Sequence, residues 1–259
     1  MTRIKLLSTD FDGTLFTEFE HPPIPSELQE QIARLQAEGA RWIINTGRDM
    51  SSLMEALGRA GIEVEPDYLV LVEREVYQHR DSQYVPLPEW NEACHRAHAE
   101  LFARIRPDVP AMVAWINARF HARIYEDAYS PLCLITSTNG DMDLILDHLE
   151  HYCRRVPDLT VVRNDVYARF SHRAYNKGTA LAEITRRLGL SREAVFAAGD
   201  HLNDLPMLSR AYAACLAAPA NAVPPVRAAV LEQGGYVSQA SQGAGVAEAL
   251  RYYLGAGGA

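Results

Sequence analysis

The sequence predicts an α/β fold, in which a doubly wound, Rossmann-like parallel core sheet is interrupted by an inserted α+β domain. Two observations predict it. Strand-like and helix-like patterns alternate at both ends of the chain, as in a parallel sheet with helices on its faces. Between them, strand-like runs separated by short turns indicate an antiparallel sheet that carries helices. We therefore expect a core of residues 1–82 and 174–259, and an inserted domain of residues 83–173.

The first half of the core contains three predicted strands with two helices between them. Each strand is a short apolar run, and Leu28, Ile32 and Leu35 recur at helical spacing in the first helix. Gly39 and Gly61 end the two helices. In chain order, these elements are a strand at 4–7, a helix at 27–38, a strand at 41–45, a helix ending near 60 and a strand at 68–72.

The inserted domain breaks this alternation. A helix is predicted at 89–105, followed by strands at 112–116, 121–125 and 132–137, a helix from 139 to 154, and strands at 160–163 and 166–170. The alternation returns with a helix that begins at Lys177. It is followed by a strand at 194–198, a short helix at 205–209, a strand at 211–216, a helix ending near 232, an edge strand at 236–237 and a helix at 243–254.

Composition and charge exclude several classes of protein. The chain has 259 residues, 48% of them hydrophobic, and a net charge of −8 without clustered Lys and Arg, so a nucleic-acid partner is not expected. No apolar run approaches the ~20 residues that span a bilayer. The N-terminal Met1–Lys5 lacks the plan of a signal peptide, which predicts a cytoplasmic protein. We expect a monomer or a small homo-oligomer.

The cysteines predict neither a zinc site nor a disulfide framework. There are four of them, scattered along the chain and without a Cys-x-x-Cys pair. We expect buried free thiols.

Two carboxylates, Asp10 and Asp12, follow the first predicted strand. On a continuing strand both would point to the same face. Close carboxylates raise each other's pKa unless a positive charge lies between them, and a hard divalent cation with oxygen ligands is the obvious candidate. An ordinary acidic turn is the alternative. The rest of the sequence is needed to choose between a cation site and an acidic turn.

Polar clusters also follow two further core strands. Ligands bind at the carboxyl ends of strands in open parallel sheets, so these clusters should meet the Asp10 pair at one edge. Lys177 begins a core helix and can reach the same place. The set suits a Mg²⁺ ion that bridges protein carboxylates and a phosphate. The clusters are Thr46 with Gly47, and Asp200 with Asn203 and Asp204.

Four short motifs in order resemble those of the haloacid dehalogenase superfamily of phosphatases. They are Asp-Phe-Asp-Gly-Thr-Leu at 10–15, Asn-Thr-Gly-Arg at 45–48, Asn-Lys-Gly at 176–178 and Gly-Asp-His-Leu-Asn-Asp at 199–204. The second and fourth motifs resemble those of the Cof-type branch. That branch carries a large α/β cap between its second and third motifs, where the insertion lies here.

The resemblance implies a role for each catalytic residue. Asp10 would be the nucleophile that becomes an aspartyl phosphate, and Asp12 the general acid and then the general base. Lys177 would neutralise a phosphate oxygen and the Asp10 charge. Thr46 and the Gly47 amide would bind the phosphate.

The metal and substrate residues are implied in the same way. Asp200 would bind Mg²⁺ together with Asp10 and the backbone carbonyl of Asp12. Asp204 would support the metal shell or Lys177, and Asn203 would contact phosphate or a metal-bound water. Three further residues either face the substrate or lie at the domain hinge: Arg48, Arg169 and His172. For Arg169 and His172, we slightly favour the hinge.

The function implied is that of a Mg²⁺-dependent phosphatase for a small phosphorylated metabolite, with a sugar phosphate favoured. A phosphomutase on the same scaffold and a non-catalytic metabolite-binding protein are the alternatives.

Overall fold

The computed structural model describes residues 4–255, and the chain divides into two compact units. The first unit combines the N-terminal part of the chain, up to Leu87, with the part from Lys177 onward. The second comprises Pro88–Asn176, so it is an insertion into the first.

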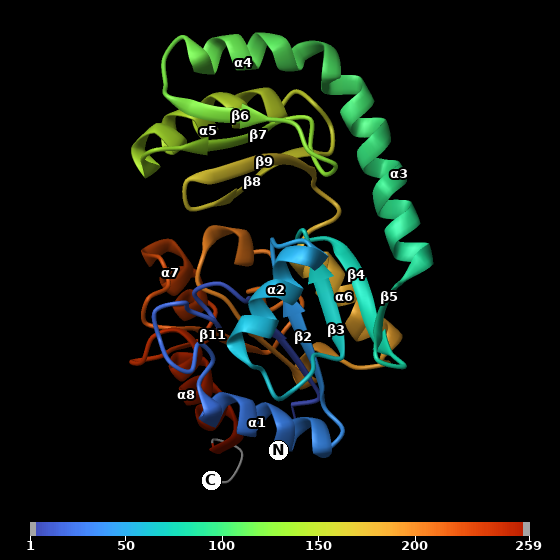
Figure 1. Ribbon diagram of the computed structural model, residues 1–259, viewed down its shortest axis with the longest axis vertical. Helices are drawn as coiled ribbons and strands as arrows, with labels where there is room; N and C mark the ends of the chain where they lie inside the picture. The colour runs from blue at the N-terminus through green and yellow to red at the C-terminus, as the bar shows by residue number, and fades with distance from the viewer. Residues whose placement is uncertain (1–3, 256–259) are drawn as a thin grey trace. The chain divides into compact units, whose positions relative to one another are not determined.

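The first unit is built on one eight-stranded sheet (Figure 1). Its strands are β1 (Leu6–Thr9), β2 (Arg41–Asn45), β3 (Tyr68–Leu71), β4 (Glu75–Arg80), β5 (Gln83–Pro86), β10 (Val195–Ala198), β11 (Cys215–Ala218) and β12 (Tyr236–Val237). They lie in the order β12-β11-β10-β1-β2-β3-β4-β5. All neighbours from β12 to β3 are parallel, and β4 and β5 extend the sheet as an antiparallel hairpin.

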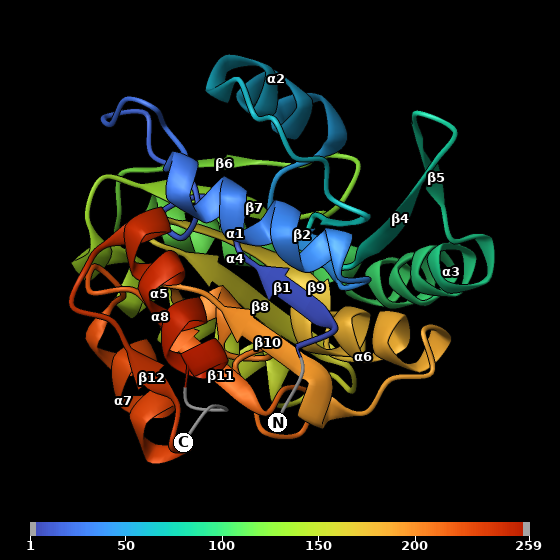
Figure 2. The same ribbon diagram turned by 90° about the horizontal axis from the view of Figure 1, so that it is seen from below.

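Helices cover both faces of this sheet, which confirms the doubly wound core. They are α1 (Ser26–Ala37), α2 (Met50–Ala60), α6 (Lys177–Arg187), α7 (Pro224–Glu232) and α8 (Gln242–Gly255). Figure 2 shows α1 and α2 on one side of the sheet and α6 and α7 on the other. Strand β1 is therefore buried along its whole length, as expected of a central parallel strand.

The second unit contains a four-stranded antiparallel sheet in the order β6-β7-β9-β8. Its elements are α3 (Pro88–Ile105), α4 (Val109–Asn117), β6 (Ala122–Tyr125), β7 (Cys133–Thr136), α5 (Asn139–Cys153), β8 (Leu159–Asn164) and β9 (Tyr167–His172). Its core joins apolar side chains of α4 and α5 to Leu134, Ala168 and Phe170 of the sheet. The inserted α+β domain is thus confirmed.

The predicted strand at 112–116 is wrong, because this segment belongs to α4. Pro110 occupies the first turn of the helix, where its missing N–H costs nothing. Met112 and Ile116, four residues apart, are the buried residues of α4. The apolar run therefore follows helical spacing rather than the alternation of a strand.

Three further differences concern short elements of the core. The β4–β5 hairpin was not predicted, because its turn uses Asp81 and Ser82 at positive φ rather than the usual Asn-Gly signal. Strand β11 begins at Cys215, and the preceding residues form turns rather than the strand expected from 211. The expected short helix near 205 is a single 3₁₀ turn, Leu202–Asp204.

All four cysteines are free and buried, as expected. Burial raises the pKa of Cys133 to about 11 and that of Cys153 to about 12. Among residues 4–255, none of the helices combines the length and the apolar character needed to cross a bilayer.

Candidate active site

The site begins where β1 ends. The backbone N–H of Asp10 donates to Ala198 O (2.9 Å), so the carboxylate stands at the end of a fixed strand pair. The chain then turns at Gly13, whose φ is +74°. A Cβ at Gly13 would lie 2.5 Å from Asp200 Oδ2, so only glycine allows this loop to approach the Asp200 carboxylate so closely.

Lys177 joins two carboxylates in the interior of the first unit. Its Nζ donates to Asp10 Oδ1 and to Asp204 Oδ1, each at 2.6 Å, and its side chain is fully buried. Gly178 makes this reach possible, because a Cβ there would lie 2.2 Å from Pro206 O. Helix α6 therefore begins in direct contact with the segment that follows Asp204.

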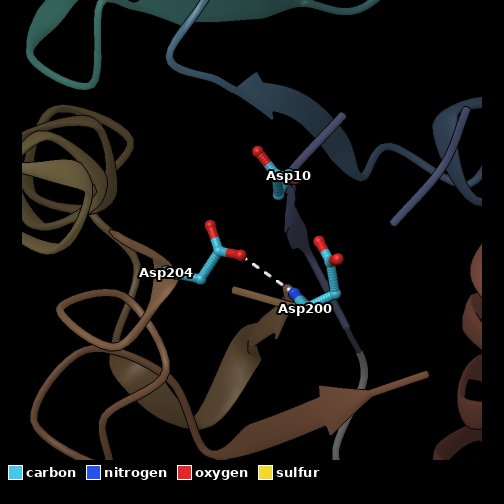
Figure 3. Close-up of side chains that lie close together, drawn as sticks. All are labelled: Asp10, Asp200 and Asp204. Carbon is cyan, nitrogen blue, oxygen red and sulfur yellow. Dashed lines mark hydrogen bonds between the residues drawn. The ribbon is translucent and has the colours of Figure 1, made fainter. Parts of the chain in front are cut away.

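A third carboxylate, that of Asp200, completes the cluster. One oxygen each from Asp10, Asp200 and Asp204 lies within 4.8 Å of the others, and Figure 3 shows the three side chains gathered around one space. Asp204 Oδ2 accepts from the backbone N–H groups of Asp200 and His201, both at 2.9 Å. Asp200 Oδ1 accepts from Thr14 Oγ1 (2.8 Å).

Burial and an excess of negative charge together set the electrostatics of this cluster. Burial, followed by repulsion from Asp204, holds the pKa of Asp10 well above its ordinary value despite the contact with Lys177. Burial and Asp204 likewise raise the pKa of Asp200 to about 7. Burial alone would lower the pKa of Lys177, but Asp10 and Asp204 outweigh it and raise that pKa. One ammonium therefore faces three carboxylates, which is a suitable environment for a divalent cation.

Asp12 lies in a different setting from Asp10. Arg48 binds it through two parallel hydrogen bonds, from Nη2 to Oδ1 (2.6 Å) and from Nε to Oδ2 (2.8 Å). Arg48 Nη1 also donates to Ser52 Oγ (3.0 Å). The Asp12 side chain is 41% exposed, so this carboxylate is open to solvent while its orientation is fixed.

Thr46 and Gly47 lie directly after β2, as predicted. Thr46 is buried, and its Oγ1 accepts from the Arg48 backbone N–H (3.2 Å), which shapes the loop. Asn203 lies between Asp200 and Asp204 in the 3₁₀ turn and donates from Nδ2 to Glu73 Oε1 (3.0 Å).

Glu73 is a site residue that the sequence reasoning missed. It follows β3 at the same sheet edge, so the strand-end rule that found Thr46 could have found it. Its φ is +67° and that of Val72 is +44°. Positive φ is uncommon for such residues, particularly a β-branched one, and costs on the order of 1–3 kcal/mol per residue.

Arg169 and His172 lie on β9 in the second unit. The His172 backbone N–H donates to His98 Nε2 (3.1 Å). Since Ala168 and Phe170 pack in the core, alternation along β9 directs His172 to the core face and Arg169 to the opposite one. The two side chains therefore belong to different faces of this sheet.

Comparison with known proteins identifies the class. The profile of the haloacid dehalogenase-like hydrolase family matches residues 7–72 and 117–250. The chain belongs to this family, and within it to the Cof-type phosphatases.

Relatives and solved structures agree with this assignment. The chain is 24% identical to 5-amino-6-(5-phospho-D-ribitylamino)uracil phosphatase YcsE of Bacillus subtilis, over 97% of this chain and 96% of the relative. It is 25% identical to the HMP-PP phosphatase of Shigella boydii, over 86% and 91% of the two chains. The sucrose-phosphatase of Synechocystis, solved with sucrose and phosphate, has the same fold, with a TM-score of 0.74, 19% identity and coverage of 97% and 98%. The protein is therefore a phosphatase that acts on small phosphorylated metabolites.

Proposed function

We propose that the protein is a Mg²⁺-dependent phosphatase that hydrolyses a sugar phosphate through an aspartyl-phosphate intermediate. One observation supports this proposal more strongly than the others do. Lys177 bridges Asp10 and Asp204 inside the first unit, with Asp200 in the same cluster. A nucleophile, a fixed cation and a further acidic ligand thus lie together at the carboxyl edge of a parallel sheet.

Asp10 is the proposed nucleophile. Lys177 holds Asp10 Oδ1, which leaves the other carboxylate oxygen to attack phosphorus. A bond forms between that oxygen and phosphorus as the bond from phosphorus to the leaving alkoxide breaks. Lys177 also attracts the phosphate to a nucleophile that would otherwise repel it. In the second step water attacks the aspartyl phosphate and releases inorganic phosphate.

Asp12 is the proposed acid and base. It gives its proton to the leaving alkoxide in the first step and takes one from the attacking water in the second. Its partial exposure suits this role, because the carboxyl must exchange protons with solvent between turnovers. We assign Arg48 to holding Asp12 in place rather than to the substrate, since its guanidinium is committed to that carboxylate.

The donor set fits Mg²⁺, which prefers carboxylate oxygens. When bound, the ion would neutralise charge on the phosphate and on the acidic cluster. Asp10 and Asp200 are the side chains best suited to hold it, with the Asp12 backbone carbonyl as the expected third ligand. Both Asp204 oxygens already accept hydrogen bonds, so we propose that Asp204 mainly positions Lys177. Thr46, the Gly47 amide and Asn203 remain the proposed phosphate contacts.

The preference for a sugar phosphate is supported by the fold shared with sucrose-phosphatase across nearly the whole chain. A polyol phosphate of the kind named for YcsE is the closest competing substrate. The cytoplasmic location and the monomeric or small oligomeric state stay predictions.

The test is a screen of phosphorylated metabolites against the purified protein, with release of inorganic phosphate as the readout and with or without Mg²⁺. Hexose and pentose phosphates should give the highest kcat/KM, and activity should disappear with a chelator and return with Mg²⁺. If the protein hydrolysed p-nitrophenyl phosphate but none of the sugar phosphates, the proposed substrate class would be rejected. No release from any phosphomonoester would reject the function itself.

A further inference from the structure

The turn after β3 is held in an unusual conformation next to the proposed phosphate loop. Val72 N donates to Arg48 O and Glu73 N donates to Thr46 O, both at 2.9 Å. The positive φ values of Val72 and Glu73 thus occur where the turn is tied to the loop after β2. Such observed strain often marks a functional position, because surrounding contacts must hold it in place.

The Glu73 side chain lies between the two proposed phosphate-binding segments. It is buried, and its Oε1 accepts from Asn203 Nδ2 (3.0 Å). The same oxygen would lie 3.4 Å from a Cβ on Gly47, so the carboxylate packs directly on that glycine. Glu73 therefore contacts Gly47 on one side and Asn203 on the other.

This contact fixes the orientation of the Asn203 amide. An ionised carboxylate only accepts hydrogen bonds, so Nδ2 must face Glu73. Asn203 Oδ1 is buried and has no hydrogen-bond partner among the described residues. One Nδ2–H and the Oδ1 acceptor are thus left for a ligand.

We propose that Glu73 is a positioning residue that holds Asn203 and the Gly47 loop ready for the phosphate group. The inference rests on the proposed function, whose phosphate site it completes. Glu73 is negatively charged and so is a poor direct partner for phosphate. Its charge also helps to raise the pKa of Lys177. Glu73 instead orients the side chain of Asn203, which is neutral and can contact an anion or an ordered water.

The experiment is a double-mutant cycle in the full chain with Mg²⁺, using inorganic phosphate as the probe. Its affinity is measured by calorimetry and by inhibition of p-nitrophenyl phosphate hydrolysis. Glu73→Gly suits the positive φ, so this variant removes the carboxylate without adding strain. We expect Glu73→Gly and Asn203→Ala each to weaken phosphate binding about tenfold, and the double variant to be no weaker than Asn203→Ala.

Glu73→Gln is the matched control, because its amide oxygen can still accept from Asn203. It should bind phosphate within about threefold of the unchanged protein. Three results would overturn the proposal: additive losses of about a hundredfold in the double variant, unchanged phosphate binding in Glu73→Gly, or a wild-type protein that does not bind phosphate. Because the calorimetric arm needs no turnover, failure of the proposed hydrolysis would be seen separately, as absence of phosphate release.

Discussion

Two carboxylates separated by a single residue lie in opposite settings. Asp10 belongs to a buried cluster with Lys177 and Asp204, whereas Asp12 is partly exposed and paired with Arg48. The difference fits the two roles that we propose for these residues. A nucleophile benefits from fixed geometry and neighbouring charge, while an acid and base must exchange its proton with water. The buried cluster and the Asp12–Arg48 pair can be tested against each other by substitution.

The largest effect is expected for Asp10→Asn. The amide cannot form the aspartyl phosphate, so kcat should fall by a factor on the order of 10⁴ or more. Phosphate release measures the loss, and circular dichroism checks that the fold is kept. Activity close to that of the unchanged enzyme would show that another group attacks phosphorus.

Lys177→Met should damage both activity and stability. It leaves the buried Asp10 and Asp204 without their cation, and loss of one partner from a buried pair costs about 3–5 kcal/mol. Urea unfolding at neutral pH measures the change in the free energy of unfolding. The control is Lys177→Met combined with Asp204→Asn, which should recover part of the loss because one unpaired charge is removed.

Asp12→Asn should lower kcat by about 10²–10⁴ while changing the free energy of unfolding by less than about 1 kcal/mol. The side chain is partly exposed, so its ion pair contributes little to stability. This loss of activity without a loss of stability differs from the result expected for Lys177→Met, which should lose both. A large loss of stability in Asp12→Asn would remove the contrast between the two regions.

Stability of the metal-free protein should fall as the pH rises from about 4 to about 7. Burial raises the Asp200 pKa to about 7, so across this range the folded state holds a proton that the unfolded state has lost. Asp200→Asn should flatten this part of the curve of unfolding free energy against pH. An equally steep curve in that variant would assign the dependence to other groups.

The smallest effect is expected for Arg48→Lys. Lysine keeps the charge but cannot form two parallel hydrogen bonds with Asp12. We expect kcat to fall about tenfold with little change in KM, because Asp12 is held less firmly. A rise in KM with unchanged kcat would return Arg48 to the substrate-binding role that the sequence suggested.

The sequence predicted the parallel core and the neighbours of Asp10 from one rule. Motifs at the carboxyl ends of parallel strands must meet at one edge, which brings Asp200 to Asp10 from far along the chain. Lys177 was expected to reach the same edge from the start of a core helix. The rule gives no side-chain direction within a loop. It therefore could not show that Arg48 turns towards Asp12, or that Glu73 reaches Asn203.

The inserted domain was harder to predict in detail. The run at 112–116 is apolar throughout, so its period was ambiguous, and Pro110 was the available sign of a helix start. In the core, the β4–β5 hairpin lacked the usual turn residues. Both errors arose where short segments carry weak local signals and packing decides the outcome.

The four buried cysteines make the protein well suited to site-specific labelling. Their thiols lie away from solvent, and burial raises the pKa of Cys133, Cys153 and Cys215, so little reactive thiolate forms at neutral pH. A cysteine introduced at the exposed Leu144 or Leu231 would react first. One dye on each unit could then measure the distance between the two units in solution without removal of any native cysteine.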